Sequence, residues 1–295
     1  MAFHLKVGED VEKALRRIAL AQIDCAVKAA DHTARDAAPH AIRKQCKKLR
    51  GLLRLFRGSF DDYRVEQRTL RDTARTLAAL READAHLEAL ERLCSRDPAR
   101  YQGPDFERAR GWLRSRREAL VRANEEDACI EAALAMLRAQ RERVGQWTLR
   151  ASGFDVIEDG VTGTYRQARD ALAVACDDPT AHHLHELRKQ VKYHRFHLDL
   201  LHKLWPGPIA AVAHEARELG EILGEHHDID VLIAVLAQGD AGLEINEAGH
   251  RIAVAARPER ERLEANALCL ARRLMAERPR SFGRRMRGYW EAWRS

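Results

Sequence analysis

The stretch His40-Ala-Ile-Arg43-Lys44-Gln45-Cys-Lys47 occurs a second time in this chain, as His185-Glu-Leu-Arg188-Lys189-Gln190-Val-Lys192. Five of the eight positions are identical, and the two copies lie 145 residues apart. Each copy is followed by one member of a second pair of related motifs. The first copy is followed by Arg81-Glu-Ala-Asp84 and the second by His227-Asp228-Ile-Asp230, at an offset of 146. Similar motifs in the same order indicate an internal duplication. We therefore predict a single domain over residues 1–295, with related helical halves at 1–150 and 151–295.

The remaining sequence is typical of α-helices. Ala, Leu, Arg and Glu dominate long stretches, and apolar residues recur at spacings of three and four. A long helix is expected over 64–94, and prolines such as Pro258 are expected in the breaks between helices. The glycine-containing stretch 145–163 is expected to be an irregular boundary between the halves, with a helix from Thr164 onward. The prediction is an all-α fold.

Several classes of protein are excluded by composition. The chain contains no apolar run of about 18 residues, and acidic residues occupy the position where a signal peptide has its apolar stretch. We therefore expect a cytoplasmic protein that does not bind membranes. The six cysteines form no CxxC pair, so no zinc or redox site is predicted, and reduced, mostly buried thiols are expected.

The charge is unevenly distributed along the chain. The net charge is +6, from 51 basic and 45 acidic residues, but residues 1–150 hold 31 basic and 23 acidic residues while 151–295 hold 20 and 22. Ten of the fourteen histidines lie in the second half, so we expect its charge to vary with pH near neutrality. The segment from His40 to Arg57 contains no acidic residue.

A helix over this acid-free segment would have a cationic face and an apolar face. At about 100° per residue, His40, Arg43, Lys44, Lys47, Arg50 and Arg54 share one side, opposite Ile42, Cys46, Leu49, Leu52, Leu53 and Phe56. Like charges at this spacing cost roughly 0.2–0.5 kcal/mol per pair, so an anion is expected to offset the repulsion.

The second copy predicts a similar but shorter stripe, formed by His185, Arg188, Lys189, Lys192 and Arg195. His194 and His197 fall on its apolar side and are expected to be packed, hydrogen-bonded structural histidines. Two matched stripes predict a groove suited to a linear, repeating polyanion.

Four segments in order resemble the CHAD domain, a family of helical domains named for conserved histidines. Residues 39–57 are similar to its first basic helix, 156–169 to the segment that opens its second half, 185–196 to its second basic helix, and 219–232 to its LGxxxDxDVL stretch. The resemblance implies two antiparallel four-helix bundles related by a pseudo-twofold axis. It also implies a central basic groove that binds inorganic polyphosphate, as a binding module without catalysis, metal or cofactor, at polyphosphate granules.

The resemblance and the two stripes together define the expected binding residues. They are His40, Arg43, Lys44, Lys47, Lys48, Arg50, Arg54, Arg57, Arg166, Arg169, His185, Arg188, Lys189, Lys192, Tyr193 and Arg195. Lys48 corresponds to Tyr193 and Arg54 to Asp199 across the repeat, so the first stripe is expected to dominate binding. Some CHAD proteins carry a triphosphatase domain of the CYTH type, but its ExExK pattern does not occur in this chain.

Two other functions compete with this prediction. His226, His227 and Asp228 are residue types that hold divalent cations in metal-dependent phosphohydrolases of the HD type. Structural pairing of Asp228 and Asp230 with arginines of other helices fits the repeat better. A nucleic acid would also be attracted to a cationic groove, but the basic helices offer few aromatic residues for base stacking, so no specific nucleic acid is expected.

The arginine-rich run 278–290 is expected to close the second bundle, with Phe282, Met286, Tyr289 and Trp293 toward the core.

Overall fold

The computed structural model describes residues 3–32, 37–123, 126–238 and 242–295, which are almost entirely helical. The helices are α1 (Val11–His32), α2 (Ala38–Leu55), α3 (Tyr63–Thr76), α4 (Ala78–Arg96), α5 (Pro104–Ala123), α6 (Glu126–Val144), α7 (Asp155–Asp177), α8 (Ala181–Leu201), the 3₁₀ helix η2 (His202–Leu204), α9 (Pro206–Leu236), α10 (Leu243–Leu274) and α11 (Pro279–Arg294). The described residues contain one isolated β-bridge, Phe60 to Leu149, and no strand. The predicted all-α fold is confirmed. None of the helices described has the length and apolar character needed to cross a membrane.

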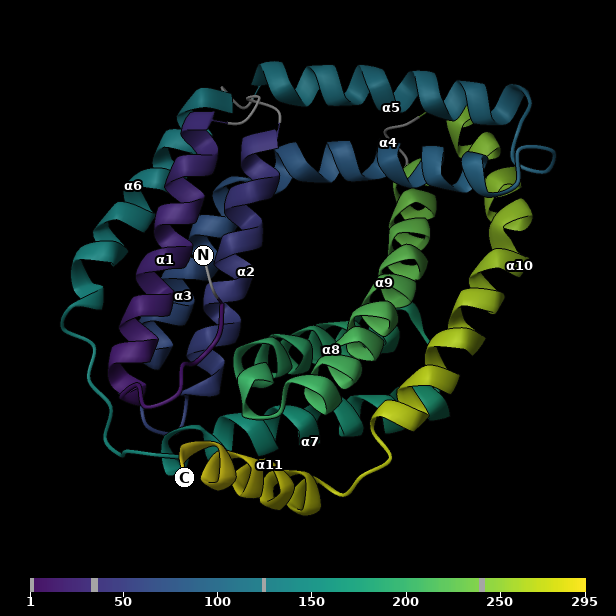
Figure 1. Ribbon diagram of the computed structural model, residues 1–295. Coiled ribbons are helices and arrows are strands. Elements are labelled where there is room, and N and C mark those ends of the chain that lie inside the picture. Colours follow the sequence, from purple (N-terminus) through teal and green to yellow (C-terminus); the bar gives the residue numbers. More distant parts are fainter. Residues whose placement is uncertain (1–2, 33–36, 124–125, 239–241) are drawn as a thin grey trace.

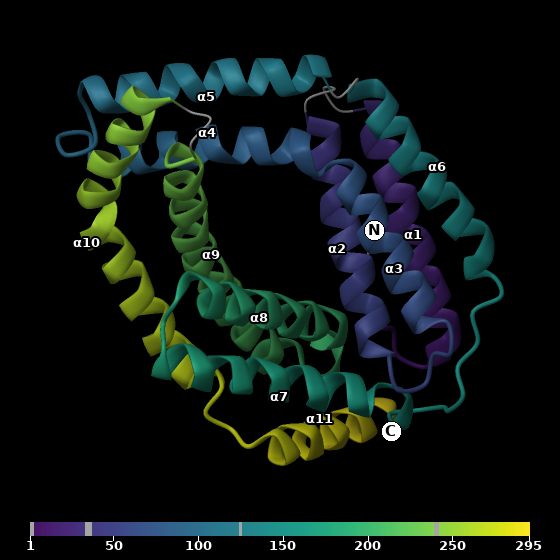
Figure 2. The same cartoon turned by 180° about the vertical axis from the view of Figure 1, so that it is seen from behind.

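The helices form a closed ring, which is visible from both sides (Figures 1 and 2). One group consists of α1, α2, α3 and α6, and a second of α7, α8, α11 and the first part of α9. Helices α4 and α5 pack against α9 and α10 and form a third group, which the sequence did not indicate. The pseudo-twofold relation between the two halves remains a prediction.

Two hydrophobic cores hold this ring together. The larger core joins the first two groups, and the smaller core contains Leu90, Leu113, Leu232 and Ile252, from α4, α5, α9 and α10 respectively. Helices α9 and α10 are long enough to contribute one end to each core. Both halves of the chain therefore share both cores, and the ring is held together by apolar contacts between them.

The prediction of an irregular segment over 145–163 is wrong for residues 155–163, because α7 begins at Asp155. Gly160 and Gly163 lie within this helix, where glycine normally lowers helix stability. A β-carbon at Gly160 would lie 1.9 Å from the Leu55 carbonyl oxygen of α2. The glycines are therefore required by close packing of α7 on α2 and do not mark a linker.

Two further expectations about helix breaks are also wrong. The helix expected over 64–94 is divided at the fully buried Leu77, from which α4 leaves in a new direction (Figure 1). The sequence pattern does not mark Thr73 or Thr76 as a helix break. In the structure, the hydroxyl groups of both residues donate to backbone carbonyls at 2.8 Å just before this break. Pro258 lies inside α10, on its exposed side, and α10 is visibly curved (Figure 1).

Candidate functional site

Helices α2 and α8, which carry the two copies of the repeated motif, pack directly against each other. Gly51 permits this approach, because a β-carbon there would lie 2.7 Å from Cδ2 of Phe196. The Nε2 atom of His197 lies 3.1 Å from the Gly51 carbonyl oxygen. Burial lowers the pKa of His197 to about 3, so the neutral ring donates its hydrogen to this oxygen.

The second histidine on the apolar side of α8 is also structural. His194 is buried, and its ring centroid lies 5.2 Å from that of Tyr165 and 5.5 Å from that of Phe282. Burial lowers its pKa to about 3. The prediction of packed, hydrogen-bonded structural histidines is confirmed for His197, whereas His194 is packed but its Nε2 atom is buried without a hydrogen-bond partner among the described residues.

Four cations form what we call the central cationic cluster, where α2 crosses α8: Lys47, Arg188, Lys192 and Arg195. Burial is the main cause that lowers the pKa of Lys192 from 10.5 to about 7, and the charges of the other three cations lower it further. Asp228 of α9 acts in the opposite direction, but its carboxylate also forms an ion pair with Arg92 at 2.5 Å. The positive charge around Lys192 is therefore only partly offset by acidic neighbours.

Two histidines lie beside this cluster. The ring centroids of His185 and His227 are 4.4 Å apart. Burial lowers the pKa of both, that of His227 to about 4, so these two rings are neutral at pH 7. Within the described residues, Nδ1 of His185 and Nε of Arg188 are buried and have no hydrogen-bond partner. Leaving such an atom unpaired costs about 1–3 kcal/mol, which an anion accepting from Arg188 would recover.

The cationic residues continue along α2 toward α7. Arg54 stacks over the ring of Tyr193, with its guanidinium carbon 4.4 Å from the ring centroid, and donates to Oε1 of Gln167 at 2.5 Å. Arg57 donates to the same oxygen at 3.4 Å. Burial and the charges of Arg54 and Arg166 lower the pKa of Arg57. Three guanidinium groups therefore follow one another from α2 onto α7.

Three predicted binding arginines form bonds within the protein. Arg43 donates to the Ala74 carbonyl oxygen at 2.6 Å, and Arg50 donates to a glutamine side chain of α3 at 3.1 Å. Both bonds hold α2 against α3. Arg169 donates to the backbone carbonyls of residues 275–277, where α10 ends. It thereby fastens the C-cap of α10 and the two residues that follow it to α7. A role of Arg43, Arg50 and Arg169 in ligand binding remains a prediction.

The other predicted binding residues differ in exposure. His40, Lys44 and Lys189 are exposed, and Lys189 forms an ion pair with Glu186 at 2.5 Å. Lys48 is half-buried, and burial lowers its pKa. The structure thus brings Lys47 of α2 together with Arg188, Lys192 and Arg195 of α8.

The acidic motif on α9 has structural partners. Asp228 is paired with Arg92 of α4, and Asp230 is paired with Arg260 of α10 at 2.5 Å. The Nδ1 atom of His226 lies 3.1 Å from the Asp230 carboxylate. The interpretation that both aspartates pair with arginines of other helices is confirmed. In the part of the chain that the structure describes, no group of three or more potential ligands is arranged to hold a metal ion.

Some cationic residues near these elements were not predicted as binding residues. Burial lowers the pKa of Arg195, and Arg217 of α9 lies close enough to lower it further, an effect that Asp199 and Glu221 oppose. Arg217 lies outside the repeated motifs, so the repeat did not identify it as a candidate binding residue. The run 278–290 lacks acidic residues, as the segment 40–57 does, and this signal was visible in the sequence.

The fold and the site together define an all-helical domain with a partly buried cationic cluster between two basic helices. The family model of the CHAD domain matches residues 17–237, and the chain belongs to this family. The resemblance found in the sequence is thereby confirmed. The structure is similar to that of PptA from Streptomyces chartreusis, with a TM-score of 0.62 and 16% sequence identity over 90% of this chain and 99% of that chain. The search of curated proteins gave no match.

Proposed function

We propose that this protein binds inorganic polyphosphate in a groove lined by α2 and α8, and that it is a binding module without catalytic activity. The observation that carries the proposal is the state of Lys192. Its ammonium group lies among three other cations, and its pKa is about 7. A multivalent anion would stabilise the charged form of Lys192 and accept from the unpaired Nε of Arg188.

A linear polyphosphate suits this site better than a nucleic acid. Arg and Lys bind phosphate oxygens without base contacts, and the cations follow α2 toward α7 as a row. Single-stranded nucleic acids are usually held by aromatic side chains that stack on bases. Tyr193 is the aromatic residue in this row, and it is buried beneath Arg54. The CHAD family resemblance supports the same ligand.

A competition experiment tests the choice of ligand. The protein is titrated with long-chain polyphosphate, single-stranded RNA and duplex DNA at equal phosphate concentration and equal salt, and binding is followed by calorimetry. We expect polyphosphate to bind most tightly. Equal affinities for the three polymers contradict the proposal, and so does steady release of phosphate from polyphosphate in the presence of Mg²⁺.

A pair of matched variants tests the location of the site. Lys44 and Lys47 are exposed on α2, and Lys13 and Lys28 are exposed on α1. K44E/K47E and K13E/K28E change the net charge equally. We expect polyphosphate affinity to fall roughly 100-fold in the first variant and only a few-fold in the second, because short-range charge contacts outweigh the screened field of distant charges. Equal losses would show that binding follows net charge alone.

The proposal includes a cellular location. A cytoplasmic protein with this site is expected to accumulate on polyphosphate granules in cells that store the polymer. A fluorescent fusion of the wild-type chain should mark the granules, whereas the K44E/K47E fusion should remain diffuse. Identical distributions of the two fusions would contradict this location.

A further inference from the structure

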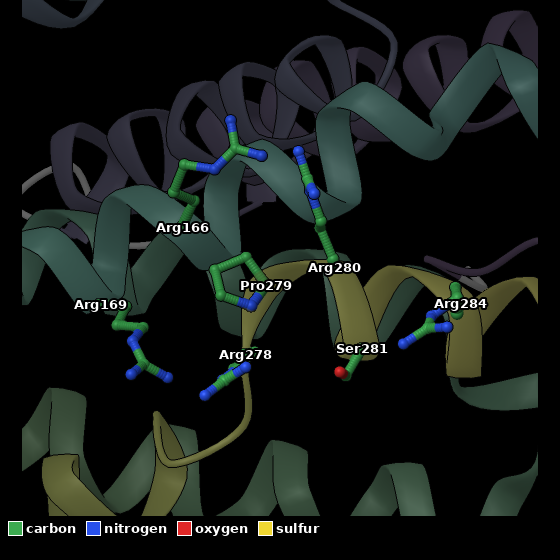
Figure 3. Close-up of a pocket in the computed structure, with 7 residues that line it drawn as sticks. All are labelled: Arg166, Arg169, Arg278, Pro279, Arg280, Ser281 and Arg284. Atoms are coloured by element: carbon green, nitrogen blue, oxygen red, sulfur yellow. The ribbon is translucent and has the colours of Figure 1, made fainter.

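A second strongly cationic surface lies away from the central cationic cluster. A pocket of about 650 Å³ between α7 and the start of α11 is lined by Arg166, Arg169, Arg278, Arg280 and Arg284 (Figure 3). Its lining contains no acidic side chain. Arg166 and Arg280 extend their guanidinium groups to one side of Pro279, and those of Arg169 and Arg278 lie on the other side (Figure 3). We call this surface the C-terminal arginine pocket.

The position of these arginines is electrostatically unfavourable without a ligand. Helix α11 begins at Pro279, has no acidic residue in its first turn and receives no side-chain cap from Arg278. Helix N-termini carry a partial positive charge and favour acidic residues there. Arg280 and Arg284 lie in the first two turns of this helix, so their charges add to that of the N-terminus. An anion would offset both.

Neighbouring arginines of α11 show how such charges are usually compensated. Arg285 pairs with Glu277 at 2.7 Å, and Arg287 pairs with Glu158 at 2.6 Å. By contrast, among the residues that the structure describes, no acidic side chain pairs with any of four arginines in the pocket: Arg166, Arg278, Arg280 and Arg284. The pocket therefore holds positive charge without acidic partners, whereas Arg285 and Arg287 of the same helix each have one.

One wall of the pocket is fixed by Arg169. Its guanidinium group donates to the carbonyl oxygens of Met275, Ala276 and Glu277, at 3.3, 3.2 and 2.6 Å. These bonds fasten the connection between α10 and α11 to α7, so the arginines on both sides are held at a defined separation. A preformed site loses less conformational entropy when it binds its ligand.

The pocket is connected to the row of cations on α2. A second cavity of about 430 Å³ is lined by Arg57, Arg64 and Arg166, with Asp159 as its one carboxylate. Arg166 lines both cavities, and its charge also lowers the pKa of Arg57. Guanidinium groups therefore continue from α2 across α7 to the start of α11.

We propose that the C-terminal arginine pocket is a second phosphate site, which holds a distal segment of the same polyphosphate chain that the central cationic cluster binds. This inference rests on the proposed function. It makes affinity depend on chain length, because only a long chain reaches both sites. Engagement of a second site by one tethered ligand raises affinity without any change at the first site.

The test compares long-chain polyphosphate with tripolyphosphate, at equal phosphate concentration, in wild-type protein and in R278Q/R280Q/R284Q. The control is R68Q/R75Q/R257Q, which removes three exposed arginines that line neither cavity. In wild type and in the control we expect the long chain to bind roughly 100-fold more tightly than tripolyphosphate. In R278Q/R280Q/R284Q this ratio should fall at least tenfold, while tripolyphosphate affinity changes little.

The outcomes separate this inference from the proposed function. If wild-type protein binds neither ligand, both fail. If it binds both ligands and R278Q/R280Q/R284Q keeps the wild-type ratio, or the control loses it equally, only the second site is contradicted. Thermal unfolding without ligand gives an independent readout. The triple variant should be at least as stable as wild type, because it removes cations from a helix N-terminus, whereas a structural role for these arginines would lower its Tm.

Discussion

At the scale of single residues, the site contains a lysine whose pKa lies near neutrality. Burial keeps His185 and His227 neutral, but the same burial brings the pKa of Lys192 to about 7. Lys47 on α2 and Asp228 on α9 act on it from the neighbouring helices, with opposite signs. The histidine-rich sequence pointed to pH sensitivity, but in this cluster the sensitivity lies at a residue with an ordinary pKa of 10.5.

This arrangement predicts that polyphosphate affinity falls as pH rises above 7. Below pH 7 Lys192 is charged before the ligand binds, whereas above it a proton must be taken up, so affinity is expected to fall by up to about tenfold per pH unit. K192R should bind without this dependence, because arginine remains charged. K192M should bind weakly at every pH. Calorimetry between pH 6 and 9 measures the effect, and an equal slope in K192R would assign it to another group.

The stability of the ligand-free protein should show the opposite trend. The pKa of Lys192 is about 7 in the folded protein and near 10.5 in the unfolded chain, so between these values the unfolded chain binds more protons. The contribution of Lys192 to stability therefore rises with pH across this window, and bound polyphosphate should abolish this dependence, because it keeps Lys192 protonated in the folded protein as well. The difference between wild type and K192M in chemical unfolding isolates this contribution.

At the scale of the helices, three glycines in helix interiors have different surroundings. A β-carbon at Gly160 would lie 1.9 Å from the Leu55 backbone oxygen, one at Gly163 would lie 1.8 Å from the Arg57 guanidinium, and one at Gly220 would meet nothing within 4 Å. The same substitution should therefore have three outcomes, set by whether the neighbouring atom can move.

We expect Gly160→Ala to destabilise the protein by about 2–3 kcal/mol, because two backbones must separate. Gly163→Ala should cost less, since the Arg57 side chain can move, but it should weaken polyphosphate binding. Gly220→Ala should stabilise by roughly 0.5–1 kcal/mol, because alanine favours helix at an open position. Urea unfolding and titration with polyphosphate measure all three. A stabilising effect of Gly160→Ala would contradict the described packing of α7 on α2.

These helices also show what local sequence can predict. The amphipathic pattern located α2 and α8, because a core face and a charged face leave a period in the sequence, and the absence of acidic residues further marked α2. The start of α7 could not be predicted, because Gly160 is explained by the Leu55 carbonyl, a contact between distant segments. Likewise, periodicity does not show that the two ends of α9 enter different cores. Of the expected binding residues, Arg43, Arg50 and Arg169 make structural bonds that depend on which helices become neighbours.

At the scale of the whole molecule, the two cores divide the ring unequally. The central cationic cluster lies on helices of the larger core, whereas the smaller core holds α4 and α5 to the far ends of α9 and α10. Ion pairs such as Asp228 with Arg92 and Asp230 with Arg260 also join helices of the smaller core. Regions with separate, smaller apolar cores can open locally without global unfolding.

We therefore predict that the smaller core can be weakened without loss of binding. Leu90 and Leu49 are both fully buried, in the smaller and the larger core respectively. Leu90→Ala should cost about 2–5 kcal/mol locally. It should accelerate hydrogen exchange in α4, α5 and the adjoining parts of α9 and α10, while polyphosphate affinity stays within about threefold of wild type, since distant sites act independently. The matched Leu49→Ala should accelerate exchange in α2 and α8 and weaken binding. Uniform acceleration over all helices in both variants would show instead that the ring unfolds as one cooperative unit.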